Sequence, residues 1–293
     1  MNTVDFRRWV HRAAALYCPA GRAAEYGARG KLAGDPVYRA LLSPQLIPDG
    51  SRVLDLGCGR ALLAAWLKTV RQDYDAGQST EWADPPPRLG SYQGIELMAA
   101  DAQCARIALG SEARMIITGD MQTAVWDQAD VVVMLDVLYF LEPAAQEKLL
   151  ARVRRDLPIN GLLLIRVADA AAGPRFWWTL LVDHIAAAWR GHGFSRFHCR
   201  PLGDWTRLLE RLGFSCETQP MSAGTPFHNI LIVARPENRR GLWDVAPSAS
   251  GVQPWHPSPV PLAPPYRPVA NLLRPPGQTR PVPVSGLVYS EVE

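Results

Sequence analysis

The chain has 293 residues, of which 48% are hydrophobic and 20% charged, and its formal net charge is +3. These values are ordinary for a folded protein and exclude a mostly disordered, collagen-like or disulfide-stabilised chain. The charge is spread thinly: by direct count, residues 1–50 carry about +3, residues 51–235 about −1 and residues 236–293 about +1. Since no region is strongly basic, we do not expect a nucleic-acid partner.

The cysteines and apolar segments indicate a reduced, cytoplasmic protein. Five cysteines are present and none forms a Cys-x-x-Cys pair, so their spacing predicts neither a metal site nor a disulfide framework. No apolar run approaches the roughly 18 residues that a membrane span needs. Arg7, Arg8 and Arg12 interrupt the apolar stretch that a secretory signal requires, so we expect none.

Residues 1–50 are expected to form a helical cap that precedes the main domain. Its first segment places Phe6, Trp9, Val10 and Ala13 on one helical face. We interpret this basic amphipathic helix as packed on its own domain, with peripheral contact to a membrane surface as the alternative.

From residue 51 to about 170, strands and helices alternate. Such alternation implies βαβ units and a parallel sheet. The apolar runs predict five strands, at 53–56, 92–97, 115–117, 129–135 and 162–167. Helices are expected at 61–69, 99–109 and 143–157, and a polar, Pro-rich loop at 72–91.

The pattern changes after the fifth strand. Residues 171–200 predict an inserted helix that acts as a lid, after which a helix opens at Pro201 and two strands follow near 214–219 and 229–234. The main domain is therefore expected to span 51–235. Residues 236–293 hold 13 of the 26 prolines without clear periodicity, which is typical of a disordered tail.

The strongest motif is the sequence Asp55-Leu56-Gly57-Cys58-Gly59, in which an apolar strand ends in a glycine-rich loop that opens a helix. Glycines allow close approach of the backbone to a ligand, and a helix N-terminus offers free N–H groups. Further acids, Glu96, Asp120 and Asp136, end the next three predicted strands. In open parallel sheets, ligands bind at these carboxyl ends. Four acids there suit a ligand with ammonium, ribose and adenine groups and no phosphate.

These motifs resemble the class I S-adenosylmethionine-dependent methyltransferases over about residues 25–235. The resemblance implies a Rossmann-like α/β fold, a three-layer sandwich around a seven-stranded, mostly parallel sheet whose last strand is antiparallel. It implies S-adenosylmethionine as cofactor, with the glycines under its methionine part, Glu96 on the ribose and Asp120 with Met121 on the adenine. The residues expected to bind the cofactor are Asp55, Gly57, Cys58, Gly59, Glu96, Leu97, Asp120, Met121 and Asp136.

A nicotinamide-binding domain is the nearest alternative for the glycine-rich loop. That class of domain has Gly-x-Gly-x-x-Gly, whereas Leu62 occupies the last glycine position here and Asp55 precedes the loop. Ala61 stands where the methyltransferase motif often has a third glycine. Both the sequence of the loop and the position of the acid favour the sulfonium cofactor.

The segment after the fourth strand bears on the substrate. Methyltransferases of nucleic-acid bases usually have an Asn/Asp-Pro-Pro-aromatic motif there, whereas this chain has Asp136-Val137-Leu138-Tyr139. We therefore expect methylation of a small or carrier-bound organic acceptor, most simply at oxygen. The alternatives are a protein or RNA methyltransferase and a non-catalytic module for cofactor binding or interaction.

Three residues are candidates for a catalytic role, and each has a purely structural alternative. His184 lies on the apolar stripe of the predicted lid, His228 precedes the last strand, and Tyr139 is placed to border the reactive methyl group. Tyr17 and Tyr26 are candidates for closing over the cofactor.

Two segments, 28–32 and 221–227, look like those of bacterial methyltransferases found beside polyketide or aryl-polyene pigment genes. In such a protein, Arg29 and Lys31 would meet an acidic carrier. The simpler expectation is that both face solvent.

Overall fold

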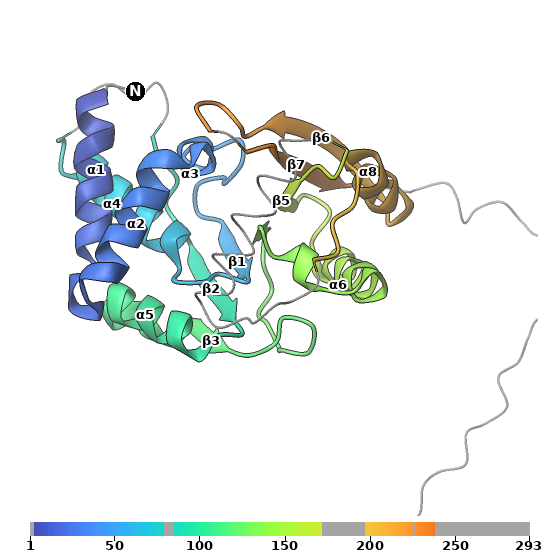
Figure 1. The fold of residues 1–293 in the computed structure, drawn as a ribbon, viewed down its shortest axis with the longest axis horizontal. Coiled ribbons are helices and arrows are strands. Elements are labelled where there is room, and N and C mark those ends of the chain that lie inside the picture. Colours follow the sequence, from blue (N-terminus) through green and yellow to red (C-terminus); the bar gives the residue numbers. More distant parts are fainter. Residues whose placement is uncertain (1–2, 79–84, 172–196, 226, 238–293) are drawn as a thin grey trace, which may run out of the picture. The chain divides into compact units, whose positions relative to one another are not determined.

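The computed structural model describes residues 3–78, 85–171, 197–225 and 227–237 (Figure 1). Its centre is one seven-stranded sheet in the order β3-β2-β1-β4-β5-β7-β6, in which β1 to β5 run parallel and β7 runs antiparallel to both of its neighbours. The strands are β1 (Arg52–Leu56), β2 (Ser91–Glu96), β3 (Ile116–Thr118), β4 (Val131–Leu135), β5 (Leu162–Ala168), β6 (Phe214–Pro220) and β7 (Asn229–Pro236). This confirms the predicted fold class.

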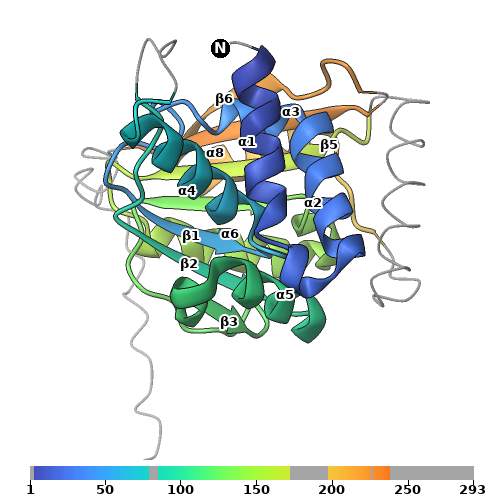
Figure 2. The same ribbon diagram turned by 90° about the vertical axis from the view of Figure 1, so that its left-hand side faces the viewer.

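Helices cover both faces of the sheet, which makes three layers (Figures 1 and 2). On one face lie α1 (Thr3–Ala15), α2 (Arg22–Gly34), α3 (Pro36–Ala40), α4 (Leu62–Asp75) and α5 (Ala99–Leu109), and on the other lie α6 (Pro143–Asp156) and α8 (Leu202–Arg211). Three short 3₁₀ helices, η1 (Cys18–Ala20), η2 (Gly110–Met115) and η3 (Leu138–Phe140), complete the described elements.

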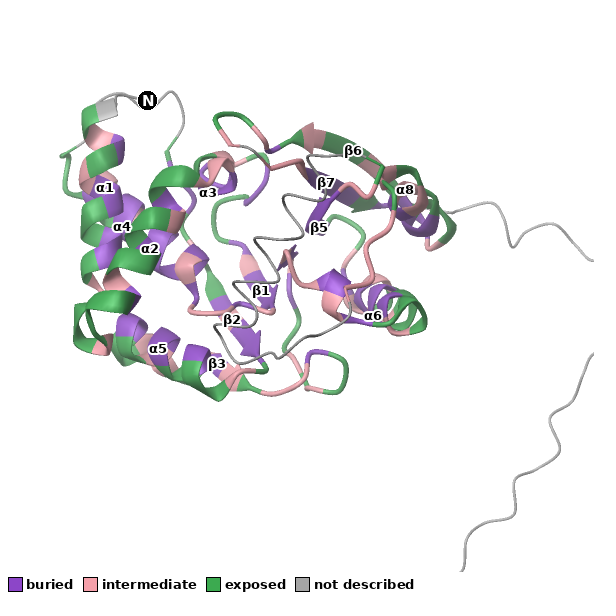
Figure 3. Cartoon of the chain, in the orientation of Figure 1, coloured by how far each residue is buried: buried purple, intermediate pink, exposed green. Residues whose placement is uncertain are grey.

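The run of valines in β4 explains why the sheet is buried on both faces. Val131 and Val133 join the core under α4, while Val132 joins the core under α6. Successive side chains of a strand point to opposite faces, so an unbroken apolar run serves both cores. The central strands β1, β4 and β5 are accordingly buried, whereas the edge strand β6 and the outer helix faces are largely exposed (Figure 3).

The apolar face of α1 packs on the domain, as we expected. The rings of Phe6 and Trp9 contact that of Trp66 in α4 edge-on, with centroids 5.6 and 6.5 Å apart. The indole N–H of Trp66 donates to the backbone oxygen of Tyr38 at 2.7 Å, which ties α4 to α3. Within the described segments, no helix has the length and apolarity that crossing a membrane requires.

Helix α4 is longer than predicted. The predicted loop at 72–91 is wrong for its first residues, since the helix continues to Asp75. The reason is Asp73, a fully buried acid that pairs with Arg8 and Arg12 of α1. The polar sequence at the end of α4 predicted a loop, but arginines of α1 neutralise its buried aspartate and the segment is helical. Most of the expected lid (172–196) and of the tail (238–293) lies outside the described residues.

Two glycines give a matched test of packing. A Cβ on Gly94 in β2 would lie 2.7 Å from Cys58 Sγ and 2.9 Å from Ile116 Cδ1, whereas one on Gly30 in α2 would meet no atom within 4 Å. We predict that Gly94→Ala lowers the free energy of unfolding by about 1–3 kcal/mol through overpacking. Gly30→Ala should raise it by about 0.5–1 kcal/mol, since glycine weakens a helix interior.

Urea unfolding monitored by circular dichroism measures both changes. A Gly94→Ala protein as stable as the wild type would contradict the packing of Cys58 against β2.

Candidate functional site

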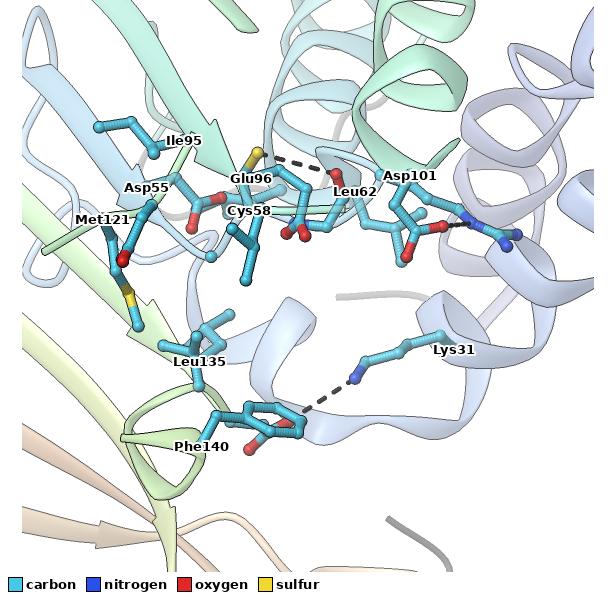
Figure 4. A pocket seen from close by; sticks show the side chains of 18 of the residues that line it. Lys31, Asp55, Cys58, Leu62, Ile95, Glu96, Asp101, Met121, Leu135 and Phe140 are labelled. Carbon is cyan, nitrogen blue, oxygen red and sulfur yellow. Dashed lines mark hydrogen bonds and ion pairs between the residues drawn. The ribbon is translucent and has the colours of Figure 1, made fainter. Parts of the chain in front are cut away.

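A cavity of about 450 Å³ opens at the carboxyl ends of β1, β2 and β4. This is the edge of the sheet where the strand order reverses, with β1 between β2 and β4. Its volume lies in the range of small-molecule sites. Figure 4 shows side chains from the sheet, from α5 and from the N-terminal helix α2 converging on it. Its ionisable lining residues among those described are Lys31, Tyr38, Asp55, Cys58, Arg60, Glu96, Asp101, Asp120, Asp136 and Tyr139.

The glycine-rich loop between β1 and α4 has left-handed backbone conformations that suit glycine. Gly57 and Gly59 have φ angles of +75° and +56°. A Cβ on Gly57 would lie 2.4 Å from Val137 Cγ2, so the turn after β4 leaves no room for a side chain there. Ala61, which stands where the motif often has a third glycine, has the left-handed conformation at φ +54°. The backbone path of the motif is therefore retained although the residue differs.

Glu96 ends β2 and shapes the loop. Its carboxylate accepts hydrogen bonds from the N–H of Gly59 at 2.8 Å and of Met98 at 2.7 Å. Each carboxylate oxygen has a second lone pair, so Glu96 can still accept from hydroxyl groups in the cavity. The sequence predicted the position of this acid, but not that it also holds the glycine-rich loop.

Asp55, at the fourth position of β1, is buried beneath the loop. It accepts a hydrogen bond of 2.7 Å from the hydroxyl of Tyr92. Burial raises the pKa of Asp55 to about 7, Tyr92 opposes this rise, and the nearby charge of Glu96 adds to it. The side chain is thus poised to titrate near neutral pH.

At the far end of the cavity, the turn after β3 presents Asp120 and Met121. The Asp120 carboxylate accepts from the backbone N–H of Gln122 at 2.8 Å. Arg152 of α6 holds the turn from behind, since its guanidinium donates to the backbone oxygen of Ala124 at 2.8 Å. Met121 also lines the cavity and belongs to the same buried core cluster as Ile95. The predicted lining residue Leu97 is 60% exposed beside them.

Asp136 lies at the cavity wall, but an arginine that we did not predict holds its carboxylate. Arg166, in the middle of β5 and only 1% exposed, donates to Asp136 Oδ1 at 2.8 Å through Nε and pairs with Oδ2 through Nη2. Its Nη1 lies 2.5 Å from Asp35 Oδ1 at the start of α3. Burial alone would raise the pKa of Asp136, but the positive charges of Arg166 and Lys31 keep it below its usual value. The sequence signal was an arginine within an apolar strand.

A second ion pair at the cavity was also missed. Arg60, which follows the glycine-rich loop, donates to Asp101 of α5 at 2.8 Å. The described lining includes five acids and two cations, Lys31 and Arg60. The pair with Asp101 already engages the charge of Arg60. Within the described part of the chain, no group of three or more potential ligands could hold a metal ion.

The candidate catalytic residues are placed differently from one another. Tyr139 lines the cavity, and its ring packs against Phe140 and Phe197 with centroids 4.7 and 4.8 Å away. His228 does not line the cavity; its backbone oxygen accepts from the N–H of Asp169. His184 lies outside the described residues.

The two tyrosines expected to close over the cofactor do not line the cavity. Tyr26 is 62% exposed, and Tyr17 is buried with its hydroxyl donating to the Arg60 oxygen at 2.8 Å. In contrast, Tyr38, which we did not single out, lines the cavity, and burial raises its pKa well above the usual value. It is therefore a neutral hydroxyl at neutral pH.

A buried glutamine of α6 holds the backbone around η3 in place. The side-chain amide nitrogen of Gln146 in α6 lies 2.8–3.1 Å from the backbone oxygens of Leu138, Leu141 and His198, so these three acceptors share its two N–H groups. Its Oε1 accepts from Arg200 Nε at 2.7 Å. This side chain fixes the backbone on both sides of Tyr139, and with it the aromatic wall of the cavity.

The raised pKa of Asp55 predicts a pH-dependent stability. In the unfolded chain an aspartate has a pKa near 3.9. Between about pH 4 and pH 7 the folded protein therefore holds a proton that the unfolded chain has released. The free energy of unfolding should fall by a few kcal/mol as pH rises through this window, and then level off above about pH 7. Asp55→Asn should remove this component.

Urea unfolding of wild type and Asp55→Asn at several pH values measures the difference. The same pH slope in both proteins would show that Asp55 is not protonated in the folded state.

The bridge from Arg166 to two acids predicts a large loss of stability when the arginine is replaced. Arg166→Met would leave the half-buried carboxylates of Asp35 and Asp136 without their main counter-charge. Breaking a buried pair from one side typically costs about 3–5 kcal/mol. We expect a loss of that size in the free energy of unfolding. The surface variant Arg155→Met is the matched control, since Arg155 is exposed and pairs only with Asp156 among the described residues. Equal losses would contradict the role assigned to Arg166.

Comparison with known proteins agrees with this geometry. A family model described as a methyltransferase domain matches residues 27–219. An O-methyltransferase family protein from Burkholderia thailandensis is similar in structure, with a TM-score of 0.50 and 14% identity over 74% of this chain and 61% of its own. Mitomycin 7-O-methyltransferase MmcR gives a TM-score of 0.51 and 21% identity over 74% of this chain and 58% of its own.

The chain thus spans about three fifths of the length of these two solved structures. No curated protein matches it. At these identities the two structures show a shared fold, and the match to the family model covers more than half of the chain. The chain belongs to the methyltransferase-domain family.

Proposed function

We propose that this protein transfers a methyl group from S-adenosylmethionine to an oxygen atom of a small or carrier-bound organic acceptor. The observation that supports this most is the cavity at the ends of β1, β2 and β4, where a glycine-rich loop with left-handed backbone lies beside Glu96. The finer assignment, to proteins of pigment pathways, rests on sequence resemblance alone.

The lining fits the cofactor in shape and in charge. Gly59 lines the cavity, and a Cβ there would enter space with no atom within 4 Å, so a side chain would occupy room that a ligand can take. Five acids against two cations give the lining a negative balance. That balance suits a ligand with a sulfonium and an ammonium group, since buried charges need partners.

Each part of the cofactor has residues that suit it. Glu96 would accept from the ribose hydroxyls. Asp120 would accept from the adenine amine, with Met121 against the ring, and Gly57 and Gly59 would lie along the methionine part. When bound, the cofactor would supply a methyl group on a positively charged sulfur. The acceptor oxygen would form the new C–O bond as the C–S bond breaks, and the sulfur would become a neutral thioether.

The chain's own residues supply position and exclude water. The buried ring of Tyr139 and its neighbour Phe140 form an apolar wall beside the end of β4, where water is kept from the reacting atoms. Arg166 neutralises the charge of Asp136 at this wall. In-line transfer depends mainly on such positioning.

Calorimetry tests the proposed cofactor. Wild type should bind S-adenosylmethionine and S-adenosylhomocysteine with micromolar Kd, about −8 kcal/mol. Glu96→Gln should weaken the binding of both compounds at least tenfold. The glutamine has one acceptor oxygen where the glutamate has two, so its NH₂ group would face a backbone N–H of Gly59 or Met98. The control is Glu112→Gln, at a half-buried glutamate that pairs with Lys68 and does not line the cavity. A folded wild type that binds neither compound would overturn the proposed function.

A further inference from the structure

Lys31 faces the cavity rather than solvent, which corrects our expectation. It lies near the end of α2, where Gly27, Ala28 and Lys31 share one helical face and line the cavity together. Figure 4 shows its side chain extending into the cavity, where a dashed line marks its ion pair with Asp136. Its side chain is 37% exposed, so the ammonium group is open to a ligand in the cavity.

The ammonium group keeps hydrogen-bonding capacity for such a ligand. Its two ion-pair contacts, to Asp136 at 3.6 Å and to Asp35 at 4.0 Å, are longer than hydrogen bonds. Both carboxylates already bind Arg166 at shorter distances. The other cation of the described lining, Arg60, donates at 2.8 Å to Asp101. An anion in this part of the cavity would therefore meet Lys31 first.

The surroundings of Lys31 fit an apolar molecule with one acidic group. The cavity that Lys31 enters is also lined by Leu135, Tyr139, Phe140 and Leu141, which supply apolar surface. Phe197 packs against both rings, at 4.8 and 5.2 Å. A charge pair is stronger in such low-dielectric surroundings than in water.

We propose that Lys31 binds a carboxylate of the methyl acceptor, so that the substrates are apolar, ring-bearing acids; this rests on the proposed function. A carboxylate suits the reaction because it already has the electron pair for the new bond and has no proton to lose, so no base is required. Methylation turns it into a neutral ester. The attraction to Lys31 is then lost, and product release is favoured.

Binding to the complex with S-adenosylhomocysteine tests this without turnover. The probes are 2-naphthoate and 2-naphthamide, which are nearly equal in shape and differ in charge. Wild type should bind the acid at least tenfold more tightly than the amide. Lys31→Met should lose this preference and Lys31→Arg should keep it, while the affinity of each variant for S-adenosylhomocysteine stays within threefold of wild type.

The matched control is Lys68→Met, which removes the same charge from the half-buried pair with Glu112, outside the cavity lining. It should keep the preference for the acid. In turnover assays with an accepted acid, Lys31→Met should raise KM by at least tenfold with little change in kcat, since it removes recognition rather than chemistry.

Three outcomes have separate meanings. Equal or undetectable binding of the two probes by wild type overturns the proposal. A tenfold loss of S-adenosylhomocysteine affinity in Lys31→Met, with the preference for the acid retained, assigns Lys31 to the carboxylate of the cofactor and also overturns it. A wild type that does not bind S-adenosylhomocysteine overturns the proposed function itself.

Discussion

The buried guanidinium of Arg166 is the interaction on which the arrangement of the cavity depends. It leaves the centre of β5 and bridges Asp136, at the end of β4, to Asp35, between α2 and α3. Asp35 also accepts from the N–H of Val37 and caps α3. One side chain thus joins the sheet to the N-terminal helices and sets the position from which Lys31 reaches the cavity. An arginine in the interior is tolerated because two carboxylates compensate for its desolvation.

A second constraint links the two strands that border the cavity. Gly57 after β1 and Val137 after β4 approach so closely that no larger residue fits at Gly57. Asp136, next to Val137, has a left-handed backbone at φ +56°, which aspartate tolerates better than most residues. The glycine-rich loop and the turn after β4 therefore depend on each other, and Arg166 fixes the second of them.

Much of the fold was predictable because the spacing of apolar residues along the sequence follows which side chains are buried. The runs in β1, β4 and β5 predicted buried parallel strands, and acids at strand ends predicted the lining at Asp55, Glu96 and Asp120. Partners that come from distant segments were not predictable. The sequence around Asp73 is polar, and its partners come from α1; likewise Lys31 resembles a surface residue until Asp136 is brought opposite it. Pairings between residues 65 and 105 positions apart leave no local pattern.

The bonds around Asp169 and Gln146 fasten the end of β5 to the start of α8. Asp169 Oδ1 accepts from the N–H groups of Ala171 and Leu202, and the N–H of Ala170 donates to the Arg200 oxygen. Gln146 adds a contact from α6 through the His198 oxygen. Asp169 therefore caps α8 from a residue just beyond β5, in place of a residue of the helix's own first turn. The loss of this one carboxylate would loosen the end of a strand and the beginning of a helix together.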